Sequence, residues 1–272
     1  MKINSETILC ASLANPNRLA KSPQMHNAGF QALGLNYIYL AFEPEEKYLK
    51  DAISGIRGLG IRGVSVSKPF KEKVVAFLDE IDPIAQDIGA VNTILNKESK
   101  LIGYNSDWIG AVHAIEQKVP VKNKKIIIVG AGGAGKAIVY GMKHAGGVVS
   151  IYNRSIKRAK ELAERFDVEF GGLLEDLSNI KDYDILINAT SVGSFPEPMD
   201  SVIPDRLLQQ GKVVMDVVFN PWNTLLLEKA ERKNCQIING LKMLLFQGVF
   251  QFKLFTGYDA PLKEMEAGLL SL

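Results

Sequence analysis

Apolar residues in the first 105 positions form short runs separated by longer stretches with helical spacing. The runs TILCASL (7–13), YIYLAF (37–42) and GVSVS (63–67) predict buried strands. The stretches SPQMHNAGFQALG (22–34) and KYLKDAISGIRGLG (47–60) predict amphipathic helices, each with a glycine where the helix would end. Strands that alternate with helices of this length favour an α/β domain with a mostly parallel sheet and helices on both faces.

A second alternation begins near residue 124 and has the order of a doubly wound, Rossmann-type nucleotide-binding domain. Its predicted strands are KKIIIVG (124–130), VVSIYN (148–153), YDILINAT (183–190) and KVVMDVV (212–218), and its predicted helices are 134–146, 156–166 and 225–235. The tail LKMLLFQGVFQFKLFTG (241–257) predicts a further helix, whose wide apolar face must be covered. We expect a first domain at 1–105, a Rossmann-type domain at 106–240, and a C-terminal region at 241–272 that packs back on the first domain.

The glycine-rich segment IIIVGAGGAGKAIV (126–139) fits two phosphate-binding patterns. Gly130, Gly132 and Gly135 match the G-x-G-x-x-G of dinucleotide-binding folds, in which a helix amino terminus faces the pyrophosphate. The corresponding loop of nucleoside triphosphatases needs a hydroxyl after its lysine to hold Mg²⁺, and Ala137 has none. The sequence therefore predicts a dinucleotide, and an ATPase is the weaker alternative.

The end of the second predicted strand in this domain favours NADP over NAD. An NAD-preferring fold usually carries Asp or Glu about 20 residues after the glycines, where it binds the ribose hydroxyls. Here the strand runs into Asn153, Arg154 and Ser155, followed by Lys157 and Arg158. A guanidinium can bind a 2′-phosphate, and no carboxylate is present to repel it. Lys157 and Arg158 are alternatively part of a solvated helix face.

Two polar segments of the first domain are candidates for catalysis. In VSVSKPFKEKV (64–74), Pro69 predicts the first residue of a helix, which places Lys71 in the first turn. The helix dipole and partial burial would favour proton release there, so Lys71 is a candidate proton donor and acceptor. Asp107 could hold this lysine by a charge-assisted hydrogen bond, or cap the helix that follows. Asn92 could bind a ligand hydroxyl, or occupy a turn.

Composition narrows the choice of partners. The net charge of +2 gives no reason to expect nucleic acid. Cys10 and Cys235 cannot form a disulfide framework, and neither they nor the scattered histidines have metal-ligand spacing, so we expect no metal. The amino terminus lacks a signal peptide's apolar stretch, and no apolar run reaches the ~18 residues of a membrane helix. We therefore expect a cytoplasmic protein that does not associate with membranes.

Nine segments, taken in order, resemble the shikimate dehydrogenase family. They are KSPQMHN, SVSKPFK, GAVNT, GYNSD, GAGGAGKA, NRS, NATSVG, DVVFNPWNT and NGLKMLLFQ, and they span nearly the whole chain. The resemblance implies an oxidoreductase that interconverts 3-dehydroshikimate and shikimate with NADP, a step of the chorismate pathway of aromatic amino acid biosynthesis. It makes the first domain the substrate-binding catalytic domain, and it leaves open a monomer or a homodimer.

The resemblance also implies roles for individual residues. Lys71 would be the acid–base residue and Asp107 its partner. The implied substrate contacts are Ser22, Ser67, Asn92 and Gln247. The implied cofactor contacts are Gly130, Ala131, Gly132, Gly133, Ala134, Asn153, Arg154, Ser155, Thr190, Ser191, Val192, Val217, Gly240 and Met243, the last packed near the nicotinamide.

Several positions depart from the family pattern. Where the family has two serines for the substrate carboxylate, this chain has Ala20 and Ser22, so one hydroxyl is missing. Ser22 could also cap the helix that begins at its Ser-Pro pair. Phe219 replaces a tyrosine, Lys242 a glycine and Trp108 another glycine. These changes indicate a divergent member of the family. One alternative is therefore an enzyme that uses quinate as substrate or NAD as cofactor. The other is a catalytically weak regulator that binds NADPH.

Overall fold

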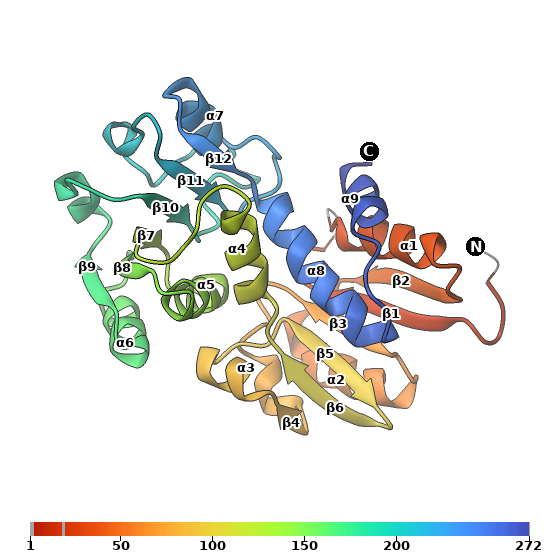
Figure 1. The fold of residues 1–272 in the computed structure, drawn as a ribbon. Coiled ribbons are helices and arrows are strands. Elements are labelled where there is room, and N and C mark those ends of the chain that lie inside the picture. The colour runs from red at the N-terminus through yellow and green to blue at the C-terminus, as the bar shows by residue number, and fades with distance from the viewer. Residues whose placement is uncertain (1–2, 18–19, 272) are drawn as a thin grey trace. The chain divides into compact units, whose positions relative to one another are not determined.

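The computed structural model describes residues 3–17 and 20–271, which belong to two compact units (Figure 1). The first unit contains the chain up to Ser106 together with the residues from Gln247 onwards, and the second unit is Asp107–Phe246. Helix α8 (Gly240–Thr256) therefore begins in the second unit and ends in the first. Each unit is built on one six-stranded sheet.

The sheet of the first unit is mostly parallel, as predicted. Its strands are β1 (Ile8–Leu13), β2 (Tyr37–Phe42), β3 (Gly63–Val66), β4 (Glu80–Ile81), β5 (Thr93–Lys97) and β6 (Lys100–Tyr104), in the order β2-β1-β3-β5-β6-β4. Strand β1 pairs in parallel with β2 and β3, and β4 pairs in parallel with β6. Only β5 runs antiparallel to its neighbours, because it forms a hairpin with β6.

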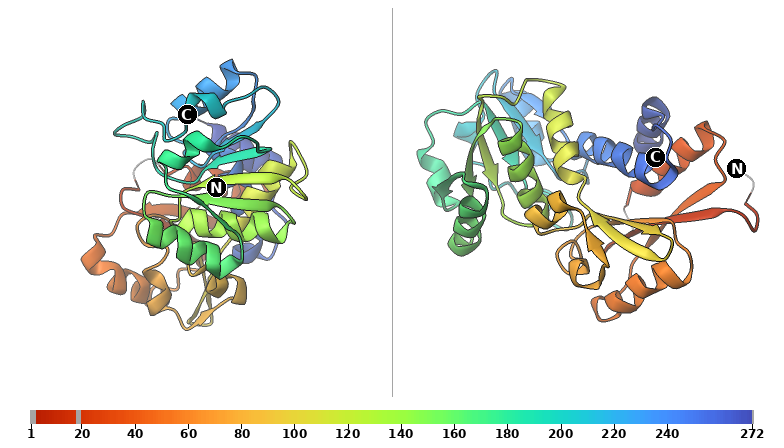
Figure 2. Two further views of the ribbon diagram at one scale, coloured as in Figure 1. Left: turned by 90° about the vertical axis from the view of Figure 1, so that its left-hand side faces the viewer. Right: turned by 60° about the horizontal axis from the view of Figure 1, so that its bottom comes forward.

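Helices cover both faces of this sheet (Figure 2). They are α1 (Ser22–Ala32), α2 (Leu49–Gly58), α3 (Pro83–Ile88), the second part of α8, and α9 (Leu262–Leu270), together with the 3₁₀ helices η1 (Glu46–Tyr48) and η2 (Val74–Phe77). On one face, Ile53 and Ile56 of α2 pack with alternate strand residues such as Val64 and Val66.

The C-terminal helices pack on the opposite side of the first unit through two glycines that admit aromatic rings. A Cβ on Gly63 of β3 would lie 2.1 Å from the ring of Phe255. A Cβ on Gly29 of α1 would lie 2.7 Å from the ring of Phe252. Phe252 and Phe255 are both fully buried, so the apolar face of α8 is covered by α1 and the sheet.

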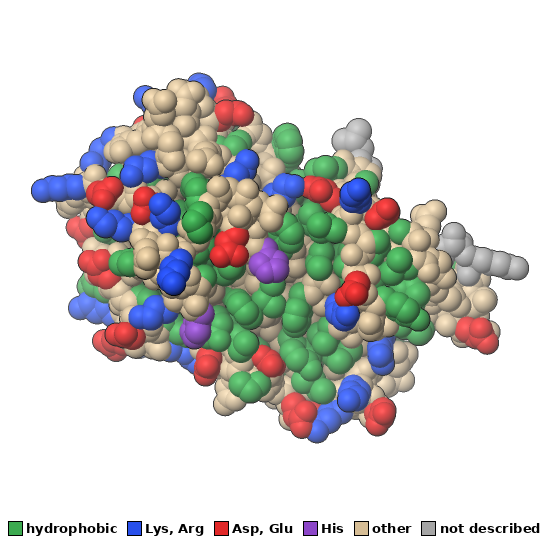
Figure 3. Space-filling model, in the orientation of Figure 1, with side chains coloured by type: hydrophobic (Ala, Val, Ile, Leu, Met, Phe, Trp, Pro, Cys, Tyr) green, Lys and Arg blue, Asp and Glu red, His purple; other side chains and the backbone are tan. Residues whose placement is uncertain are grey.

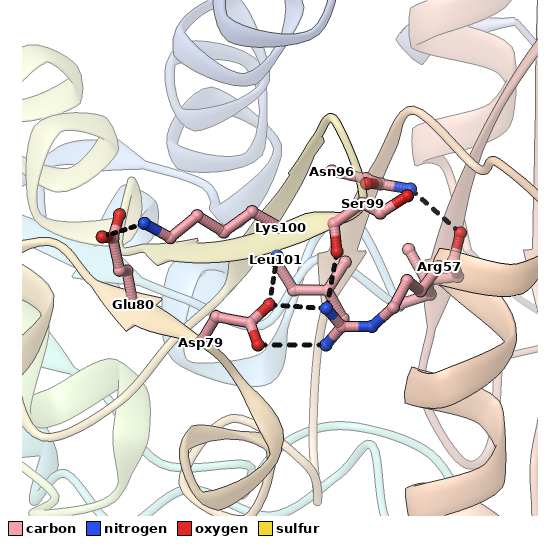
Figure 4. A network of polar contacts seen from close by, with 8 residues as sticks. Arg57, Asp79, Glu80, Asn96, Ser99, Lys100 and Leu101 are labelled. Carbon is pink, nitrogen blue, oxygen red and sulfur yellow. Dashed lines mark hydrogen bonds and ion pairs between the residues drawn. The ribbon is translucent and has the colours of Figure 1, made fainter.

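A surface network fixes the β5–β6 hairpin against α2 and β4 (Figure 4). The guanidinium of Arg57, at the end of α2, donates to both carboxylate oxygens of Asp79 (2.9 and 3.2 Å). Asp79 also accepts from the N–H of Leu101 in β6 (2.7 Å), and the hydrogen bond from Arg57 lowers the pKa of Asp79. Lys100 forms an ion pair with Glu80. At its other end the hairpin is flanked by the buried polar residues Asn92, Thr93 and Ser106. By fixing the hairpin, this network also helps to hold those residues in place.

The second unit has the strand order of the predicted Rossmann-type fold. Its strands are β7 (Lys125–Val129), β8 (Val148–Tyr152), β9 (Glu169–Gly172), β10 (Ile185–Asn188), β11 (Val213–Asp216) and β12 (Gln236–Ile238). They pair in the order β12-β11-β10-β7-β8-β9, and every pair is parallel. Counted from β7, this is the doubly wound order 3-2-1-4-5-6, and the chain reverses direction across the sheet between β7 and β10. The doubly wound prediction is confirmed.

Alternate residues of the central strand face the two helical layers of this unit. The helices are α4 (Asp107–Glu116), α5 (Gly133–His144), α6 (Ile156–Phe166), α7 (Leu225–Arg232) and the start of α8, with the 3₁₀ helices η3 (Glu175–Asn179) and η4 (Asp205–Leu207). Ile126 and Ile128 of β7 pack with α4, α5 and α6, whereas Ile127 and Val129 pack with α7, η3 and η4.

The surface has no dominant charge on the face drawn in Figure 3, where basic and acidic side chains are interspersed. Among the helices of the described residues, none is both long and apolar enough to cross a lipid bilayer. Within the same residues, no three or more His, Cys, Asp or Glu side chains gather as metal ligands would.

Candidate functional site

The three glycines of the loop between β7 and α5 meet three different constraints. Gly130 has φ +120°, and a Cβ there would lie 3.0 Å from the carbonyl of Ala189. A Cβ on Gly135 would lie 2.2 Å from the carbonyl oxygen of Gly130, so only glycine lets α5 pack against the strand end. Gly132 has φ −87° and ψ −173°, which any residue can adopt, and a Cβ there would meet no atom of the described residues within 4 Å. No contact within this part of the chain requires glycine at position 132, whereas a pyrophosphate that approached the backbone would.

The amino terminus of α5 is suited to an anion. Gly132 is its N-cap residue, so no side chain satisfies the first amides, and its first turn has no acidic residue. These amides and the positive end of the helix dipole attract negative charge. Ala137, where a triphosphatase would need a hydroxyl, is fully buried. The loop therefore fits a dinucleotide and does not fit the ATPase alternative.

Arg154 follows β8, the neighbour of β7, and is exposed. Among the described residues, no hydrogen bond or ion pair engages its guanidinium, which leaves it available to a phosphate. Ser155 has a structural role, since its hydroxyl accepts from the N–H of Arg158 (3.5 Å) and caps α6, and Asn153 donates to the carbonyl of Ser155 (3.0 Å). Lys157 forms an ion pair with Glu161 (3.9 Å) on the exposed face of α6. This agrees with the alternative prediction that Lys157 belongs to a solvated helix face.

The other predicted cofactor contacts of the second unit lie at the same edge of its sheet. Thr190–Val192 follow β10, Val217 follows β11, and Gly240 comes soon after β12. All three strands are parallel to β7, so these segments and the glycine loop share the carboxyl edge. A Cβ on Gly240 would lie 2.4 Å from the carbonyl oxygen of Val217, which places the last two directly together. Met243, one turn into α8, is buried in the core of this unit.

Asp216, at the end of β11, is a buried carboxylate to which the sequence pattern gave no role. It is 1% exposed, and its Oδ2 accepts from the hydroxyl of Thr224 (2.7 Å). Its Oδ1 accepts from Nδ2 of Asn188 and from the N–H of Val218, both at 3.0 Å. Burial raises the pKa of Asp216 from 3.8 to about 6, and these three hydrogen bonds oppose the increase.

A cluster of buried polar side chains joins β5, β6 and α8 within the first unit. Its members are Asn92, Thr93, Ser106, Gln247 and Gln251. Thr93 donates to Oδ1 of Asn92 (2.8 Å) and accepts from Nε2 of Gln251 (2.9 Å). Nδ2 of Asn92 donates to Ser106 (3.0 Å) and to Oε1 of Gln247 (3.2 Å). Asn92 and Gln247, two predicted substrate contacts 155 positions apart, are thus brought together, whereas the other three members were not predicted.

The serines expected to contact substrate have different environments. Ser22 is the first residue of α1 and no side chain caps this helix, so the predicted capping role for Ser22 is wrong. The Ser22 side chain is instead buried, whereas the hydroxyl of Tyr39 bonds to Ser65. Ser67 lies just after β3 and is exposed. Ala20 lies within the described residues and has no hydroxyl to offer this group.

Lys71 is half-buried and lies in a turn, so the predicted α-helix from Pro69 is wrong. The Lys68–Pro69 peptide bond is cis, and the only helix in this region is the short η2 that begins at Val74. The carbonyl of Lys71 accepts from the N–H of Val91 (2.8 Å) instead of a helical partner. Without an α-helix, a helix dipole cannot act on Lys71 as expected.

Asp107 is the first residue of α4 and is buried. The residue before it, Ser106, is fixed within the first unit, because its N–H donates to Oδ1 of Asn92 (2.8 Å). Asn92 directly follows Val91, which binds the backbone of Lys71. The chain therefore enters Asp107 from a segment that is held to the Lys71 turn.

The raised pKa of Asp216 predicts a pH-dependent stability. Between about pH 4 and 6 the folded chain binds more protons at this carboxyl than the unfolded chain, so stability decreases as pH rises. The difference between 3.8 and about 6 corresponds to a loss on the order of 3 kcal/mol, complete above pH 6. The side chain of the Asp216→Asn variant cannot titrate, so it does not lose this stability. The unfolding free energy of the variant, relative to that of the wild type, should therefore increase as pH rises from 4 to 6. Urea unfolding of both proteins from pH 4 to 7 checks this, and parallel pH profiles would contradict it.

Comparison with known proteins places this geometry in a family. Residues 13–94 match the shikimate dehydrogenase substrate binding domain, 113–199 match shikimate/quinate 5-dehydrogenase, and 240–270 match the shikimate 5′-dehydrogenase C-terminal domain. A shikimate dehydrogenase (NADP(+)) of Pyrococcus furiosus is 47% identical, over 97% of this chain and 95% of that protein.

Two solved structures are similar over nearly their whole length. The crystal structure of a shikimate dehydrogenase in complex with NADP⁺ has a TM-score of 0.91 and 40% identity, and covers 99% of this chain and 96% of that one. The structure of the Thermus thermophilus enzyme in complex with NADP(H) and shikimate has a TM-score of 0.88 and 34% identity, with coverage of 96% and 98%. The chain belongs to the shikimate dehydrogenase family.

Proposed function

We propose that this protein is an NADP-dependent shikimate dehydrogenase, which reduces 3-dehydroshikimate to shikimate and catalyses the reverse oxidation. The observation that carries the proposal is Gly132, whose Cβ would meet no atom of the described residues and whose glycine identity a bound pyrophosphate explains. The close relationship to NADP(+) shikimate dehydrogenases over nearly the full chain supports the choice of substrate and cofactor.

The second unit supplies the groups that would hold the cofactor. The amides of the loop from Gly130 to Ala134 bind the pyrophosphate, and the guanidinium of Arg154 binds the 2′-phosphate. Thr190–Val192, Val217 and Gly240 line the same carboxyl edge, and Met243 packs toward the nicotinamide. When bound, NADPH supplies a hydride to the carbonyl carbon of the substrate.

The first unit supplies the groups that would hold the substrate. Asn92 and Gln247 bind its ring hydroxyls, since both amides already share one buried cluster. Ser22 and Ser67 bind its carboxylate, and Ala20 offers no hydroxyl to it. Each hydroxyl bond to a charged group contributes about 1.5–3 kcal/mol.

Lys71 carries the proton in this proposal. As the carbonyl carbon gains a hydride, the carbonyl oxygen becomes an alkoxide and takes a proton from the ammonium of Lys71. In the oxidation, the neutral amine of Lys71 accepts that proton from the substrate hydroxyl. Asp107 orients the ammonium by a charge-assisted hydrogen bond. We also propose that the protein acts in the cytoplasm.

Replacement of Lys71 tests this assignment. Lys71→Ala should lower kcat by about two to four orders of magnitude and leave NADPH binding unchanged, because it removes the proton carrier only. Lys73→Ala is the matched control, since Lys73 forms an exposed ion pair with Glu46 (2.5 Å) in the same segment. Steady-state kinetics with shikimate would show a normal kcat for the control. A normal kcat for Lys71→Ala would remove Lys71 from catalysis.

Replacement of Arg154 tests the cofactor and the substrate together. With shikimate and quinate, each paired with NADP and NAD, the wild type should have its highest kcat/KM for shikimate with NADP. Arg154→Ala should raise KM for NADP by roughly tenfold to hundredfold, as expected for one lost charge-assisted contact, and leave KM for NAD nearly unchanged. Lys160→Ala, which removes an exposed positive charge from α6, is the control. Equal effects of Arg154→Ala on both cofactors would refute a 2′-phosphate contact.

A further inference from the structure

A hydrogen-bond network, buried at Asn188, Asp216 and Thr224, underlies the loops at the carboxyl edge of the second unit. Its members are Asn188, Thr190, Val192, Asp216 and Thr224. Asn188 ends β10 and shapes the loop that follows it. Its Oδ1 accepts from the N–H and the hydroxyl of Thr190 (3.1 and 2.7 Å), and its Nδ2 donates to the carbonyl of Val192 (3.2 Å). The side chain of Asn188 therefore sets the path of Thr190–Val192.

This loop lies against the glycine loop. A Cβ on Gly130 would be 3.0 Å from Cγ2 of Thr190 and 3.0 Å from the carbonyl of Ala189. The two segments flank the point between β7 and β10 at which the strand order reverses, where ligands of such folds bind. A change in the path of Thr190 would therefore alter the wall beside the phosphate-binding amides.

The carboxylate of Asp216 helps to fix which way the amide of Asn188 faces, together with the N–H of Thr190 and the carbonyl of Val192. An ionised carboxylate only accepts hydrogen bonds, so it must meet the NH₂ end of this amide, and the oxygen end must then face Thr190. The second oxygen of Asp216 is held by the hydroxyl of Thr224, which also caps α7 by accepting from the N–H of Leu227 (3.3 Å).

We infer that Asp216 is a positioning residue for the NADP site, which acts through Asn188 on Thr190–Val192 and so on the wall of the glycine loop. The inference rests on the proposed NADP-binding function. It also explains why a carboxylate is kept where burial opposes its charge. An asparagine would be easier to bury, but its neutral amide oxygen would hold the NH₂ group of Asn188 less strongly than a charged carboxylate does.

The test compares cofactor affinity with stability. Affinity is measured by titration with NADPH, followed by nucleotide fluorescence near neutral pH, and stability by thermal unfolding without cofactor. Asp216→Asn should raise the Kd for NADPH about tenfold or more, as for one lost buried hydrogen bond to a charged group, and leave the Tm equal or higher. The KM for shikimate should not change.

Two further variants separate positioning from general support of the fold. Thr224→Val loses the donor to Asp216 and should also weaken NADPH binding, whereas Thr224→Ser keeps the hydroxyl and should restore it. Ile115→Ala, in the buried core at the end of α4, should lower the Tm without raising the Kd for NADPH.

The possible results distinguish this inference from the proposed function. A wild-type Kd for Asp216→Asn, or a Kd that follows Tm across all variants including Ile115→Ala, would overturn the positioning role alone. A wild-type protein that does not bind NADPH would overturn the proposed function, and this inference with it.

Discussion

The close approach of Gly135 to the carbonyl oxygen of Gly130 is the constraint on which the rest of the second unit depends. A Cβ at Gly135 would lie 2.2 Å from that oxygen, far inside any contact that atoms tolerate. Without a side chain there, the first turn of α5 packs directly on the end of β7. The amides of that turn then open at the carboxyl edge of the sheet, where the loops after β10 and β11 also end. The absence of a side chain at Gly135 thus allows the amides of α5 to form a site suited to an anion.

Around this edge, several groups are arranged in ways that folding alone does not favour. The amino terminus of α5 has no side-chain cap, Arg154 is left without a protein partner among the described residues, and Asp216 holds a charge that burial opposes. Local features that lower stability persist where function requires them. A phosphate-rich ligand accounts for the first two directly, and the orientation of Asn188 accounts for the third.

Much of the fold was predictable because it depends on local periodicity. The long apolar runs at β7 and β8 and the amphipathic helices between the strands are visible in one stretch of sequence each. The short strands β9 and β12 were missed, since EFGG and QII contain only one and two large apolar residues, unlike the similarly short β10 and β11, which lie in longer apolar runs. The β5–β6 hairpin was missed because its inward residues include Asn92, Thr93 and Asn96, which look like turn residues until tertiary partners are known.

The residues of the candidate site were likewise predictable only where they depend on local sequence. The glycine loop and Arg154 follow from spacing, because both belong to one strand–turn–helix segment and its neighbour. Gln251 and Thr93 could not be predicted, since their contact joins residues 158 positions apart. The helix expected at Lys71 failed because the carbonyl of that residue binds Val91 from a distant segment instead of the next helical turn. Periodicity and spacing thus gave the residues that act locally, whereas the distant pair Asn92 and Gln247 was implied only by the family resemblance.

The central claim is that Gly132 is glycine for the sake of a ligand, and Gly132→Ala tests it most directly. The Cβ would meet no atom of residues 3–17 or 20–271, so thermal unfolding should show a stability change of about 1 kcal/mol or less. The Kd for NADPH should rise roughly tenfold to hundredfold, because the added methyl group overpacks the space of the pyrophosphate. A variant that binds NADPH as tightly as the wild type would contradict this account, since no phosphate could then lie against that residue.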